Sequence, residues 1–246
     1  MINFTFLQWV ISILCAVMIG FTKAGIPGSG ILVPLLAASI MPAKESTGFI
    51  LPMLIMADIF AIIYWRRHVE WKQLIRLLPW ALLGIFSGFL AMSYISNIHL
   101  RIFIGILVLA LISVSWLRNK VFPNDRMPEH WLFAAVLGTL AGSTSMMANA
   151  AGPVMVIYLL AMRLPKESFI GTSAWFFCLI NLLKLPFSNR LDLISLQSLQ
   201  TNLVLFPCII LGGIVGIILV KRIPQNVFNR AVQGLAVVGA LFLIFI

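Results

Sequence analysis

Two short stretches rich in glycine, serine and asparagine interrupt apolar segments of this sequence, one in each half. The first spans residues 25–30 and the second residues 143–152, and each is followed by prolines and a lysine–glutamate pair. A helix that begins at such a break presents unpaired backbone N–H groups and a partial positive charge of about half a unit. Two such helix ends directed at one central point would suit an anion, an arrangement typical of transporters with broken helices.

Residues at the two breaks are therefore the candidates for binding that anion. Serine, threonine and asparagine side chains offer neutral hydrogen-bond donors. Donors without a dense ring of fixed cations suit a tetrahedral oxyanion or a sulfonate, which must also be released. The same side chains could instead cap the short helices. The candidate set is Gly28, Ser29, Gly30, Ser143, Thr144, Asn149 and Gly152.

Three ionisable residues are candidates for a coupling or charge role. Asp58 and Lys184 lie within apolar segments, where an ionisable group is costly and therefore a functional candidate. Asp58 could take up a proton during transport, and the alternatives are a structural ion pair with Lys184 or a position near the membrane interface. Lys23 follows the first apolar segment and is as consistent with a cytoplasmic anchor as with substrate contact. A cation transporter is a further alternative, because unwound backbone carbonyls at the other ends of broken helices can bind sodium.

Several other classes of function are not expected from the sequence. No histidine or cysteine cluster has metal-ligand spacing, and no GxxxxGK[ST], nucleophile elbow or HExxH motif is present. We therefore predict no catalytic residue, no metal, no cofactor and no enzymatic activity. The net charge of +10 comes from basic residues scattered over short loops, so a nucleic-acid partner is not expected either.

The elements that position these residues are membrane helices. The chain is 61% hydrophobic and 10% charged, which exceeds the apolar content that a soluble core needs. Most of its apolar stretches reach the roughly 20 residues that cross a bilayer, but the second and seventh are too short to span comfortably alone. The stretches are residues 4–22, 29–41, 46–65, 74–95, 100–118, 130–147, 150–162, 167–187, 200–220 and 226–246.

The loop charges indicate how these stretches are oriented. The first lacks the charged region and cleavage site of a signal peptide, so we expect a retained helix. With an outside N-terminus, thirteen lysines and arginines fall on the cytoplasmic side and only Lys44, Arg101 and Arg190 fall outside. Each half then crosses an odd number of times, so the second half is inverted. The charge pattern does not distinguish interrupted helix pairs that cross the membrane fully from re-entrant hairpins, because both keep the number of crossings in each half odd.

The two halves also match each other residue by residue. Pro42 and Pro165 align, and Asp58 falls opposite Asn181 at an offset of 123. We predict an all-α polytopic membrane protein with two inverted repeats, each an interrupted helix pair followed by three spanning helices. The first repeat is residues 1–118, a polar linker is 119–129, and the second repeat is 130–246. Glycines four residues apart, 84 with 88 and 212 with 216, predict close helix packing.

The second break and its flanks resemble the sulfite exporter TauE/SafE family of bacterial and archaeal membrane proteins. The resemblance covers nearly the whole chain and is strongest over residues 138–153, Gly-Thr-Leu-Ala-Gly-Ser-Thr-Ser-Met-Met-Ala-Asn-Ala-Ala-Gly-Pro. The usual family motif ends in three glycines shortly before proline, whereas this sequence keeps two in its first copy and one in its second. The resemblance implies a membrane transporter that exports sulfite, sulfonates or related organic anions.

These observations together predict a multi-pass secondary transporter of a bacterial inner membrane. Its expected partners are a small anion substrate and the lipid bilayer, with proton or sodium coupling and a homo-oligomer left open. Two other functions are compatible with the same sequence: a passive anion channel, and a membrane subunit or assembly factor of a larger complex.

Overall fold

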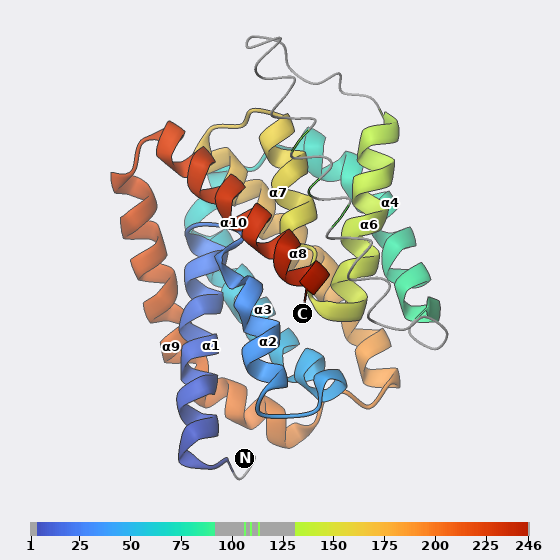
Figure 1. The fold of residues 1–246 in the computed structure, drawn as a ribbon, viewed down its shortest axis with the longest axis vertical. Coiled ribbons are helices and arrows are strands. Elements are labelled where there is room, and N and C mark those ends of the chain that lie inside the picture. Colours follow the sequence, from blue (N-terminus) through green and yellow to red (C-terminus); the bar gives the residue numbers. More distant parts are fainter. Residues whose placement is uncertain (1–3, 92–105, 107–108, 110–112, 114–130, 246) are drawn as a thin grey trace.

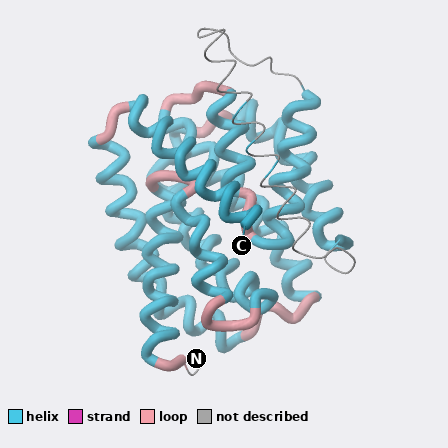
Figure 2. Tube along the Cα trace, viewed as in Figure 1, coloured by secondary structure: helices cyan, strands magenta, loops and turns pink. Residues whose placement is uncertain are grey.

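The computed structural model describes residues 4–91, 106, 109, 113 and 131–245, and within them the regular structure is helical (Figures 1 and 2). The expected fifth segment lies almost entirely outside the described residues, as does the linker 119–129. The elements are α1 Phe6–Ala24, η1 Ser29–Leu32, α2 Val33–Ala38, α3 Ala43–Trp65, η2 Arg66–His68, α4 Trp71–Ala91, α6 Trp131–Ala148, α7 Gly152–Ala161, α8 Lys166–Arg190, α9 Leu196–Arg222 and α10 Gln225–Phe245.

Five of these helices, α1, α3, α4, α8 and α9, are long and apolar enough to cross a membrane. Their outer faces expose large aliphatic side chains that suit lipid, for example Leu203, Leu211 and Val215 on α9. The prediction of an all-α polytopic membrane protein is therefore confirmed. The ten residues of α7 rise only about 15 Å, half the thickness of the hydrocarbon core. The short segments predicted at 29–41 and 150–162 correspond to η1–α2 and to α7.

Each predicted break contains a residue with left-handed backbone. Gly28 precedes η1 with φ of 97°, and Asn149 ends α6 with φ of 52°. The N–H of Asn149 donates to the carbonyl of Ser145 at 3.1 Å, and that of Ala150 donates to Thr144 at 3.2 Å. These bonds satisfy the last carbonyls of α6. The second break is therefore confined to residues 149–151 and does not begin at residue 143 as predicted, because residues 143–148 continue α6.

The two breaks create two helical hairpins. In the first hairpin, α1 runs upward from the N-terminus in Figure 1, and η1–α2 returns toward the same end, where α3 begins. In the second hairpin, α6 starts at the opposite end of the molecule and α7 returns to it, where α8 begins. The two hairpins thus enter from opposite ends, and α3 and α8 pack against each other between them.

Helices of one half pack mainly on helices of the other. The closest neighbours are α1 with α9 and α4 with α6. Glycines allow these backbones to approach closely, because a Cβ added at any of them would clash with a carbonyl oxygen of the facing helix. This is the close packing that the glycine spacing predicted. The contacts are Gly20 with Ile209 and Gly212 with Val17 between α1 and α9, and Gly142 with Ala81 and Gly84 with Thr139 between α6 and α4.

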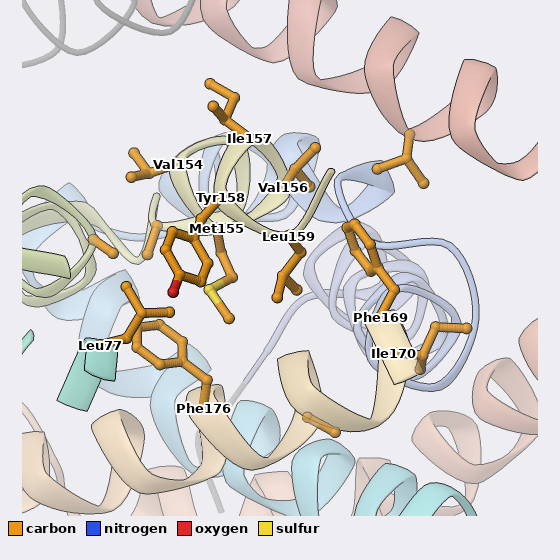
Figure 3. Close-up of a cluster of buried hydrophobic side chains, with 14 of the residues drawn as sticks. Leu77, Val154, Met155, Val156, Ile157, Tyr158, Leu159, Phe169, Ile170 and Phe176 are labelled. Atoms are coloured by element: carbon orange, nitrogen blue, oxygen red, sulfur yellow. The ribbon is translucent and has the colours of Figure 1, made fainter. Parts of the chain in front are cut away.

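The short helix α7 is enclosed by protein on most sides. Its residues from Pro153 to Leu159 are buried, and α8 and α10 pack against it. In Figure 3, Tyr158, Met155 and Leu159 extend from one side of α7 toward Leu77 of α4 and toward Phe169 and Phe176 of α8. The Tyr158 hydroxyl donates to Gln73 Oε1 at 2.6 Å. The short returning arm of the second hairpin is therefore held in the protein interior and does not face lipid.

Candidate functional site

The centre of the site is the contact between α3 and α8. There the side-chain amide of Asn181 donates to Asp58 Oδ2 at 2.7 Å, and both residues are buried, with exposed fractions of 1% and 0%. These are the two residues that align at an offset of 123 in the sequence. The crossing thus brings together matching polar positions of the two halves in the middle of apolar helices.

The first hairpin contributes Lys23, in the last turn of α1. Its Nζ lies 2.8 Å from Asp58 Oδ1, and its side chain is only 9% exposed. The ammonium group also lies over the ring of Phe177, 3.9 Å from the centroid. The sequence left open whether Lys23 is a cytoplasmic anchor or a substrate contact, and whether Asp58 pairs with Lys184. In the structure Asp58 makes its ion pair with Lys23.

The second hairpin approaches Lys184, which lies on α8 one turn after Asn181 and is 2% exposed. Its Nζ donates to the carbonyl of Ser145 at 3.1 Å and to Asn149 Oδ1 at 2.6 Å. Both acceptors are neutral. Lys184 also lies close enough to Lys23 and Asp58 for their charges to interact with its own.

Asn149 joins this hairpin to both central helices. Its Oδ1 accepts from Lys184 of α8, while its Nδ2 donates to the carbonyl of Thr47 of α3 at 3.2 Å. Asparagine is one of the few residues other than glycine that tolerates the left-handed backbone found here. The break therefore places at the tip of the hairpin an amide that donates one hydrogen bond and accepts another.

The hydroxyl groups predicted to bind substrate make local hydrogen bonds in the structure. Ser29 lies within hydrogen-bond distance of Thr22 Oγ1 and donates to the carbonyl of Ile26, at 2.8 Å in both cases. Ser143 and Thr144 donate to carbonyls three residues earlier in α6, at 3.1 and 3.2 Å. These contacts correspond to the alternative in which serine and threonine satisfy helix backbone.

The three glycines of the candidate set differ in their surroundings. Gly28 is buried in the first break, and a Cβ added at Gly30 would press on the Thr22 side chain. Gly152 begins α7, and a Cβ there would meet open space. The central cluster of Lys23, Asp58, Asn149, Asn181 and Lys184 therefore unites the charged candidates with one of the neutral ones.

Two contributors to this cluster were missed as site residues. Asn181 is a polar residue within an apolar segment, and it aligns with Asp58 in the repeat. That position could have identified it as a candidate site residue. The Ser145 carbonyl gave no sequence signal, because any residue supplies a carbonyl and only tertiary packing selects this one. Among the described residues no group of three or more histidines, cysteines, aspartates or glutamates is placed to hold a metal ion.

The electrostatics of the cluster favour an anion. With Lys23 and Lys184 protonated and Asp58 ionised, the cluster holds two positive charges and one negative charge, and the Lys184 ammonium has only neutral hydrogen-bond acceptors among the described residues. An unpaired charge in a low-dielectric interior is costly. Neutral acceptors at Lys184 reduce that cost, and a bound oxyanion would reduce it further because it would supply the opposite charge.

Comparison with known proteins identifies one family. The family model described as sulfite exporter TauE/SafE matches residues 11–243, nearly the whole chain. No curated protein matches the sequence, and no solved structure matches the fold.

Proposed function

Because the chain belongs to the TauE/SafE family of membrane transporters of sulfite-type anions, we propose that it is a secondary transporter. Its substrate is a small sulfur-containing oxyanion or a related organic anion, and its direction in the cell is export. The substrate site is the central cluster between the two hairpin tips. The single observation that carries this assignment is Lys184, a buried ammonium whose acceptors, the Ser145 carbonyl and Asn149, are both neutral.

The chemistry of the cluster agrees with such a substrate. Sulfite and sulfonates offer several oxygen acceptors, and lysine provides a compact charge with three donors. Asn149 and Asn181 add amide groups that can hydrogen-bond an oxyanion after rearrangement. Asp58 is proposed as the coupling group, because its charge is held by Lys23 at 2.8 Å and any proton it accepts would release that lysine.

The packing supports two inverted repeats as the framework for this site. A shift of 122 residues relates Gly20 of α1 to Gly142 of α6, and a shift of 128 relates Ala81 of α4 to Ile209 of α9. Gly20 closely approaches the Ile209 carbonyl, and Gly142 makes the same approach to the Ala81 carbonyl. If a two-fold axis relates the halves, each contact between them should recur between the two residues that these shifts give. The contacts of Gly20 and Gly142 are related in this way. Hairpins entering from opposite ends agree with that axis.

Reconstitution in liposomes tests the proposal. Transient currents are recorded on jumps of sulfite, sulfate, thiosulfate, taurine and acetate, with and without a pH gradient. A saturable current for one sulfur anion that changes with the gradient is the expected result. Large currents without coupling would instead indicate a channel, and silence across the panel with a folded protein would indicate a membrane subunit of a larger complex.

A further inference from the structure

Asn149 makes two of the contacts that hold the tip of the second hairpin against the central helices. Its Oδ1 accepts from Lys184 Nζ at 2.6 Å, and its Nδ2 donates to the Thr47 carbonyl at 3.2 Å. One amide therefore links the hairpin to α8 and to α3. Any rearrangement that separates this amide from Lys184 removes one of these two links.

A substrate anion would compete with Asn149 for the ammonium group of Lys184. An ammonium has three donors, and two of them are directed at the Ser145 carbonyl and at Asn149 Oδ1. An oxyanion adds the attraction of a full negative charge to such a hydrogen bond, whereas the amide oxygen of Asn149 carries only a partial charge. In a buried site, where charges are poorly screened, an oxyanion is therefore a better partner for the Lys184 ammonium than that amide oxygen.

Lys23 is not suited to the same role. Its ammonium is already paired with the carboxylate of Asp58 at 2.8 Å and lies over the Phe177 ring. An anion arriving there would meet the negative charge of Asp58 at close range. Of the two lysines, Lys184 is the one whose hydrogen-bond acceptors are neutral, so an anion can bind its ammonium without displacing a carboxylate.

The burial of Lys184 limits how an anion can replace Asn149 at its ammonium group. Lys184 is only 2% exposed, so a substrate reaches its ammonium only after the residues that cover it have moved. Asn149 is both one of those covering residues and the acceptor that would be displaced. Binding of the anion and movement of the hairpin tip therefore involve the same hydrogen bond.

We propose that Asn149 is an internal competitor of the substrate. Its amide oxygen accepts a hydrogen bond from Lys184, and the incoming oxyanion takes that place and frees the tip of the second hairpin. Asn149 thus acts on substrate affinity through Lys184, as a positioning residue. The inference rests on the proposed function, since it needs a transported anion that binds at Lys184.

Two substitutions of Asn149 test the competition in opposite directions, with KM for sulfite flux in proteoliposomes as the readout. Asn149→Gly retains the left-handed backbone and removes the competing oxygen, so KM should fall by about three- to tenfold. Asn149→Asp places a carboxylate beside Lys184, so KM should rise at least about tenfold. A merely structural role would lower the maximal rate in both variants and would not move KM in opposite directions.

The matched control is Asn189→Asp, which makes the same charge change at an exposed position near the end of α8. KM should be unchanged there. For a variant with little flux, the rise in thermal midpoint of the purified protein with added sulfite ranks affinity in the same way. Unchanged KM in both Asn149 variants, or a shift in the same direction, overturns the competition. Absence of flux for every anion in the wild-type protein overturns the proposed function itself.

Discussion

Removing one partner of the Lys23–Asp58 pair should destabilise the protein more than removing both. The two groups are 2.8 Å apart, and their side chains are 9% and 0% exposed. At an effective dielectric constant of about 20, the Coulomb attraction at this distance is about 6 kcal/mol. Desolvation of both ions offsets most of that attraction, but a single remaining charge has no partner to offset its own desolvation.

Asp58→Asn and Lys23→Met should therefore each lower the free energy of unfolding by about 3 to 5 kcal/mol. The double variant should lose less than either single variant. For a chain of this size, 1 kcal/mol corresponds to about 2 to 4 °C in the midpoint of thermal unfolding. Each single variant should thus melt about 10 °C below the wild-type protein in the same detergent, and the double variant should melt in between.

The exposed residue Arg190 provides the control, because Arg190→Met removes a positive charge from the last turn of α8 at an exposed position. Its midpoint should stay near that of the wild-type protein. Losses that simply add in the double variant would refute the reasoning, since independent sites add and coupled ones do not. A single variant as stable as the wild-type protein would refute it as well.

Three further predictions concern packing and coupling. Gly142→Ala should lower the thermal midpoint, because the added Cβ would clash with the backbone of α4, whereas Gly234→Ala should be tolerated because a Cβ there meets open space. Tyr158→Phe should cost about 1 to 2 kcal/mol, measured by thermal unfolding, because it removes the buried hydrogen bond to Gln73. Asp58→Asn should make anion flux insensitive to an imposed pH gradient, and flux that still follows the gradient would exclude Asp58 as the proton carrier.

The sequence predicted the helices well, because the length of an apolar stretch is set by the bilayer. Nine of the ten expected stretches correspond to described helices with ends shifted by a few residues. The alignment of Asp58 with Asn181 was evidence for a repeat, and the contact of 2.7 Å between them was not predicted. The success with the helices rests on patterns of apolar residues that a single sequence contains.

The details of the site depended on features that such patterns do not determine. Ser143 and Thr144 were predicted at a break but continue α6, because hydroxyl groups that bond carbonyls one turn earlier are accepted within a helix. The partner of Asp58 was set by the rotation of α1 about its axis and by the reach of Lys23. Apolar segments fix where helices cross the membrane, whereas rotation and side-chain reach decide which polar groups meet.

The assignment of the anion site to Lys184 is tested most directly by sulfite flux through liposomes that contain Lys184→Gln or Arg190→Gln protein. Both variants lose one positive charge from α8, but Lys184 is buried at the cluster and Arg190 is exposed. We expect Arg190→Gln to keep the wild-type KM and Lys184→Gln to raise it at least about tenfold or abolish saturable flux. Saturable flux with an unchanged KM in folded Lys184→Gln protein would contradict the assignment.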